Sequence, residues 1–164
     1  MNEIWGDVPT WITTFAVAVA AAQYLMERGR RKREVEREEK AQATGLTVWT
    51  VTDPDPTSRA YGVMIRNESG SAFHAVTIRV KLHGVETERP VVLTLLPPGQ
   101  FIVWQNPPGD EFTWSFPQHP SEQPRTLRPY MNSDRYAVLS VEFADNLDQR
   151  WRTDGHAVLT RVAA

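Results

Sequence analysis

Cysteine is absent from the 164 residues of this chain, which excludes disulfides, thiolate nucleophiles and cysteine-ligated metal sites. The chain also lacks a glycine-rich phosphate loop, a nucleophile elbow and a pair of histidines at helical metal-binding spacing. Its four histidines are scattered along the sequence. We therefore interpret the protein as non-enzymatic and expect no bound cofactor or metal.

Excess positive charge is missing as well. The formal net charge is −2, and residues 41–164 carry eleven Lys and Arg against thirteen Asp and Glu. A nucleic-acid-binding protein needs a basic face to neutralise phosphates. We therefore expect no nucleic-acid partner.

One stretch of the sequence has no formal charge. Residues 8–26 are nineteen uncharged, mostly apolar residues, a length at which a helix crosses the roughly 30 Å hydrocarbon layer of a bilayer. Trp11 and Tyr24 lie near its two ends, where aromatic rings prefer the membrane interface. We predict a single transmembrane helix. Because the stretch is rich in alanine and contains threonine and glutamine, a helix buried in a soluble assembly is the alternative.

The charges that flank this span predict its orientation. Glu3 and Asp7 precede it, and five basic residues follow it closely: Arg28, Arg30, Arg31, Lys32 and Arg33. Basic residues next to a span stay on the cytoplasmic side. We therefore expect a single-pass protein of the cell membrane, with residues 1–7 outside and the C-terminal domain in the cytoplasm. The five basic side chains are also predicted to contact anionic lipid head groups, which makes the bilayer a partner.

Residues 27–45 predict a charged helical stalk next to the membrane. Opposite charges recur four positions apart, as in Glu27 with Arg31, and such pairs support a helix. Val35 is the one large apolar residue between Glu27 and Ala43, so the stalk has no coiled-coil seam. Within the span, small residues four positions apart, such as Ala16 and Ala20, would let two helices pack closely. A homo-oligomer formed through the anchor is therefore one of the alternatives.

A two-residue periodicity begins after Gly45. Residues 73–83 place Val76, Ile78, Val80 and Leu82 on one face, and residues 136–143 do the same with Ala137, Leu139, Val141 and Phe143. Clusters of Pro, Gly, Asn and Asp separate further predicted strands at 46–52, 60–66, 90–96, 101–105, 111–116, 149–152 and 157–162. This pattern predicts a mainly β fold, in which residues 46–164 form an immunoglobulin-like antiparallel β-sandwich after the long N-terminal helix. A small barrel is the alternative.

A proline-rich segment, residues 117–133, interrupts the strands. Proline cannot donate a hydrogen bond to a sheet, and a loop of this length in a compact domain is often a binding loop or a mobile one. If the domain has a partner-binding surface, the first candidates are Arg125, Arg128 and Tyr130.

Several polar motifs are better explained by turns than by chemistry. Asp145, Asp148 and Asp154 do not have the spacing of a calcium-binding loop, so we predict that they form hairpin turns. Asn67-Glu68-Ser69 matches the N-glycosylation pattern, but Asn-Glu-Ser-Gly is typical of a turn between strands.

A family resemblance covers nearly the whole chain. It rests on short segments: the span PTWITTF, the arginine-rich stretch after it, IRNES at 65–69, LPPG at 96–99, VEFAD at 141–145 and WRTDG at 151–155. Together they resemble uncharacterised small single-pass membrane proteins of actinobacteria and their phages. The resemblance implies an N-terminal anchor followed by a β-sandwich, and it implies no activity or site.

The leading hypothesis is a membrane-anchored adaptor or scaffold whose cytoplasmic domain binds a protein partner that the sequence does not identify. One alternative is an enzyme or small-molecule-binding domain with a site built from loops, because residues far apart in sequence can meet at the end of a sandwich. Another is a soluble structural or virion component whose apolar helix self-associates.

Overall fold

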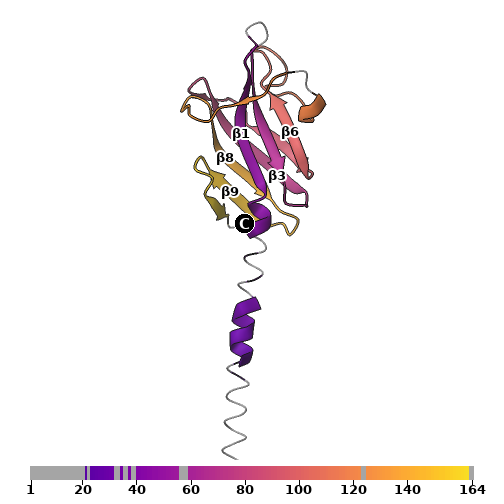
Figure 1. The fold of residues 1–164 in the computed structure, drawn as a ribbon, viewed down its shortest axis with the longest axis vertical. Coiled ribbons are helices and arrows are strands. Elements are labelled where there is room, and N and C mark those ends of the chain that lie inside the picture. Colours follow the sequence, from indigo (N-terminus) through magenta and orange to yellow (C-terminus); the bar gives the residue numbers. More distant parts are fainter. Residues whose placement is uncertain are drawn as a thin grey trace, which may run out of the picture. The chain divides into compact units, whose positions relative to one another are not determined.

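Figure 1 shows a computed structural model of the chain. It describes residues 21, 23–31, 34, 37, 40–55, 59–122 and 125–162. The chain divides into two compact units, Met1–Lys40 and Ala41–Ala164.

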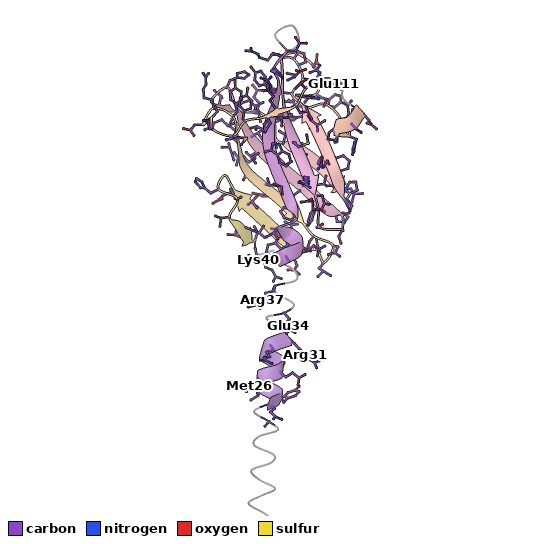
Figure 2. All side chains as sticks on the ribbon, in the orientation of Figure 1. Met26, Arg31, Glu34, Arg37, Lys40 and Glu111 are labelled. Carbon is purple, nitrogen blue, oxygen red and sulfur yellow. The ribbon has the colours of Figure 1, made fainter. Side chains whose placement is uncertain are left out.

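The described residues of the first unit are helical. Arg31, labelled in Figure 2, donates a hydrogen bond of 2.9 Å to Glu27. This is the pair of opposite charges four positions apart that was predicted for the stalk. Tyr24 and the three described basic residues Arg28, Arg30 and Arg31 are helical and exposed. Most of the predicted span, including Trp11, lies outside the described residues, as do Lys32 and Arg33. The long N-terminal helix is therefore not seen as a whole, and no helix among the described residues is long and apolar enough to cross a membrane.

The second unit contains two antiparallel sheets. Sheet A has the strand order β6 (Gly99–Trp104), β2 (Ala60–Asn67), β1 (Leu46–Asp53) and β7 (Arg128–Pro129). Sheet B has the order β10 (Leu159–Arg161), β9 (Arg150–Asp154), β8 (Ala137–Ala144), β3 (Phe73–Leu82) and β4 (Val85–Glu86), with β5 (Val91–Leu96) also paired to β3. A short 3-10 helix, η1 (Pro120–Glu122), follows β6. All strand pairs of the described residues are antiparallel, which confirms the mainly β, antiparallel prediction.

The main core lies between the two sheets. Sheet A contributes Val63, Ile65 and Val103, and sheet B contributes the predicted apolar face of β3 together with Val141 and Phe143. The prediction for β8 is wrong at Ala137 and Leu139. The β3–β8 register shifts between Arg79 and Val80, so that Val138 rather than Leu139 packs against this core. A bulge of this kind moves the following side chains to the other face of a strand.

A second, smaller core covers the opposite face of sheet A. It contains Val51, Met64, Ile102 and Trp104, with Leu127 of the proline-rich segment packed against them. The crossing segment, residues 118–130, starts at the β6 edge, where Gln118 and Ile102 exchange backbone hydrogen bonds of 2.8 and 3.0 Å. It ends at the β1 edge, where the Tyr130 amide donates to the Thr50 carbonyl at 3.0 Å. In its described residues, the segment therefore spans sheet A from edge to edge and packs against it.

Candidate functional site

The long connections of the domain gather at one end of the sandwich, opposite Leu46 (Figure 1). Strand β1 runs toward this end, and β2 runs away from it. The link between β2 and β3 therefore lies at the other end, and β3 runs toward the same end as β1. The links after β1, β3 and β6 therefore meet there. We call this the loop end.

A hollow of about 590 Å³ lies at the loop end between residues 82–89 and 105–113. Four carboxylates line it, namely those of Glu86, Glu88, Asp110 and Glu111. Arg89 is the one arginine or lysine among its described lining residues. Glu86 is neutralised by the Arg79 guanidinium, whose two nitrogens lie 2.7 and 2.6 Å from its Oε1 atom. Glu88, Asp110 and Glu111 therefore give this side of the loop end a negative potential. Figure 2 marks Glu111 at this end of the domain.

Two exposed phenylalanines extend from the loop that borders this hollow. We call residues 105–118 the Phe loop. Phe112 is 56 % exposed and Phe116 is 81 % exposed, and their ring centroids lie 6.4 Å apart. Water does not stabilise an apolar ring, so two large apolar rings exposed next to each other indicate a binding surface. A single exposed leucine is common and indicates nothing of the kind.

Hydrogen bonds hold the Phe loop in place. The Trp114 indole donates to the Arg89 carbonyl at 2.8 Å, and the Ser115 amide donates to the Trp104 carbonyl at 2.8 Å. The Asn106 side chain donates to the Phe112 carbonyl at 2.8 Å. The two phenylalanines thus stand on either side of a segment that is fixed to sheet A and to the link before β5. The predicted strand at 111–116 is wrong, because these residues make a single bridge, from Trp114 to Gln105, and prolines stand on both sides.

A stack of tyrosines forms a second cluster at the loop end. The rings of Tyr130 and Tyr136 are parallel to within 5° with centroids 4.0 Å apart, and Tyr61 lies on Tyr136 at 5.3 Å. The Tyr136 hydroxyl is hydrogen-bonded to Nδ1 of His83 at 2.9 Å. Burial, together with the hydroxyl of Tyr61 and the neighbouring Tyr130, raises the pKa of Tyr136 to about 12. Through these ring contacts and this hydrogen bond, Tyr136 joins the crossing segment to β2 and to the end of β3.

The three candidate binding residues of the proline-rich segment have different surroundings. The Arg125 guanidinium lies over the Trp104 ring, 5.2 Å from its centroid, and 3.9 Å from the carboxylate of Asp53. Tyr130 belongs to the tyrosine stack, and Arg128 is exposed on β7. Contacts within the domain thus occupy Arg125 and Tyr130. A role of all three in partner binding stays a prediction.

The polar motifs are found in turns, as expected. The Asn67 amide donates to the carbonyls of Ser71 and Leu96, and its oxygen accepts hydrogen bonds from Ser69, so this buried side chain is fully used in the β2–β3 link. Asp154 accepts the amides of Val158 and His156, which hold the pKa of its carboxyl below the usual range. Asp145 organises the turn between β8 and β9. No group of three or more His, Asp or Glu in the described part of the chain is placed to hold a metal ion.

No protein-family model, curated protein or solved structure matches the chain.

Proposed function

We propose that the protein is a membrane-anchored, non-enzymatic adaptor whose immunoglobulin-like domain binds a protein partner through the Phe loop. The observation that carries this proposal is the fixed, exposed pair Phe112 and Phe116 beside the carboxylates of Glu88, Asp110 and Glu111. Aromatic side chains are enriched at the centres of protein interfaces, where a few of them supply most of the binding energy. Because hydrogen bonds already hold the loop, binding would cost little additional ordering.

The surroundings of the two rings define the chemistry of the partner. Each phenylalanine requires an apolar pocket or groove on the partner surface. Glu88, Asp110 and Glu111 lie along the same loop end, so lysine or arginine side chains next to that pocket would be attracted to them. We therefore propose a partner surface that combines an apolar depression with a basic rim.

Replacing Phe116 by alanine should weaken the partner complex about 30-fold, which corresponds to an interface residue worth about 2 kcal/mol. The partner is first captured by a photo-activatable amino acid placed at Glu111 in the full-length chain, identified by mass spectrometry, and purified. Its Kd for the detergent-solubilised chain is then measured. Leu147→Ala is the matched control, because Leu147 is 57 % exposed but lies in the β8–β9 turn at the opposite end.

Charge should matter in the same complex. Glu111→Lys is expected to weaken binding and to reduce its dependence on salt, because the variant opposes a basic rim. Equal Kd values for the native chain, Phe116→Ala and Glu111→Lys would contradict the proposed binding surface and leave the three candidate residues of the proline-rich segment as the next to test.

The proposed anchor is residues 8–26, with the N-terminus outside and the domain in the cytoplasm. Its support is the uncharged stretch followed by basic residues. The full-length chain should stay in the membrane pellet after a carbonate wash, and protease added to intact spheroplasts should leave the domain uncut. Ala18→Arg should shift the chain toward the soluble fraction, because arginine at mid-span costs about 2.5–3.5 kcal/mol, whereas Ala18→Leu should not. Release of the native chain by carbonate would favour the soluble assembly instead.

The hollow beside the Phe loop favours a second candidate, a loop-built small-molecule site. Its volume of about 590 Å³ falls in the range of roughly 300–1,000 Å³ that such sites occupy. Ligand pockets are mostly apolar, however, and carboxylates, amides and prolines dominate this lining. We therefore place this function second.

A further inference from the structure

On the side of the sandwich formed by β1 and β8, the two sheets differ in how many strands follow. In the described part of the chain, sheet B continues beyond β8 with β9 and β10, whereas sheet A continues beyond β1 with β7 alone. Strand β7 is two residues long and pairs with Val51 and Thr52 of β1. Residues 46–49 of β1 therefore form an open edge at a position where sheet A has room for a longer strand.

Two hydrogen bonds show the direction of the backbone groups on this edge. The Gly45 carbonyl accepts from the Glu68 amide, on the β2 side, and the Thr50 carbonyl accepts from the Tyr130 amide, on the β7 side. Neighbouring residues of a strand direct their N–H and C=O groups to opposite edges. The backbone groups of Leu46 and Val48 therefore point to the same side as those of Thr50, where no described residue of the chain pairs with them.

A groove of about 220 Å³ runs beside this edge. On one side it is lined by β1, and on the other by residues of β8, β9 and β10. Four apolar side chains in it are only half buried, namely Leu46, Val48, Val138 and Leu159. Asp154 is the one charged residue among the described lining residues, and its carboxylate already accepts backbone hydrogen bonds of 2.9 and 3.0 Å from its own turn. The groove therefore suits an uncharged, apolar occupant.

We propose that this edge binds one extended segment of another protein by β-strand addition, in line with β7. Its backbone would pair with Leu46 and Val48, and apolar side chains at alternate positions would cover Val138 and Leu159. Because residues of β9 and β10 line the other side of the groove, we expect an occupant with the thickness of one strand. The site is separate from the Phe loop and does not depend on the function proposed for that loop.

The test uses the detergent-solubilised full-length chain and a phage-displayed library of random 12-residue peptides. Enriched peptides should carry uncharged apolar residues at alternate positions. Val48→Pro removes the outward N–H, and proline is tolerated on an open edge. It should weaken the Kd of a synthetic enriched peptide at least about tenfold. Val92→Ala is the control, because Val92 is 64 % exposed on β5 and does not line the groove.

Two further measurements keep the test decisive if Val48→Pro does not fold. Thr153→Trp should fill the groove from β9 without altering β1, and it should weaken the same peptide equally. In the native chain, the peptide should slow hydrogen exchange of the Leu46 and Val48 amides, while the Thr47 and Trp49 amides, which face β2, change little. Phe116→Ala should leave peptide binding unchanged. Failure to enrich any peptide, unchanged binding to Thr153→Trp, loss of binding with Phe116→Ala, or dimerisation through this edge would each overturn the inference.

Discussion

Replacing Phe73 by alanine should lower the free energy of unfolding of the domain by about 3–5 kcal/mol. Phe73 is fully buried at the start of β3, and its ring packs edge-on against Phe143 with centroids 4.8 Å apart. Removing the ring leaves a cavity that the two sheets cannot close, because both are held by their ladders on either side of it. For a domain of this size, the loss corresponds to a melting temperature lowered by roughly 10–20 °C, measured by circular dichroism.

Phe116→Ala is the matched control for this prediction, since it removes the same atoms from a ring that is 81 % exposed. It should change the free energy of unfolding by less than about 0.5 kcal/mol. The pair of variants thereby separates a loss of partner binding at the Phe loop from a loss of the fold. Similar destabilisation by both would mean that Phe116 is packed inside the protein, and the proposed interface would have to be withdrawn.

Periodicity predicted β3, which is found close to its predicted range because alternate burial is a local property that the sequence records residue by residue. Strand β2 is buried on both faces, and its range was predicted from the turn residues on either side of it. The position of Val138 on the core face, where Leu139 was expected, could not be predicted from the sequence. It results from a bulge, and a bulge depends on how β8 pairs with β3. Strands β4 and β7 are two residues long and have no periodicity to detect.

The candidate site was harder to predict for the same reason. Phe112, Trp114 and Phe116 alternate as a strand would, but Trp114 is bonded to Arg89 and both phenylalanines are exposed. The signal against a strand was present in the prolines at 107, 108 and 117. The proline-rich segment was predicted to be irregular, but it contains the short elements η1 and β7, and nothing near Leu127 in the sequence indicates that it packs on sheet A. The open edge of β1 depends on the unequal widths of two sheets, which are properties of the tertiary fold alone.

Asp145→Ala should lower the free energy of unfolding by about 3 kcal/mol, although the residue lies in a turn. The carboxylate is 2 % exposed. Its Oδ1 atom accepts the amides of Leu147 and Gln149 at 2.9 Å each, and its Oδ2 atom accepts the buried Trp151 indole N–H at 2.9 Å. Alanine would leave the buried Trp151 indole N–H without a partner, and it would also remove the acceptor of the part-buried Leu147 and Gln149 amides. A buried donor without a partner costs more than its hydrogen bond contributes in the native domain.

Two variants show whether the indole bond carries this effect. Asp145→Asn keeps the shape of the side chain but replaces one acceptor oxygen by an NH₂ group. That group must face either the Trp151 indole N–H or the turn amides, all of which are donors. The variant should therefore still lower the free energy of unfolding by more than about 1 kcal/mol. Asp148→Asn changes an exposed residue in the same turn. Asparagine tolerates its φ of 58°, so this variant should leave the free energy of unfolding nearly unchanged. Chemical denaturation followed by tryptophan fluorescence measures all three. If Asp145→Ala proved as mild as Asp148→Asn, the β8–β9 turn would have to be held by the sheet alone, and the Asp145–Trp151 contact would be a consequence of the fold rather than one of its causes.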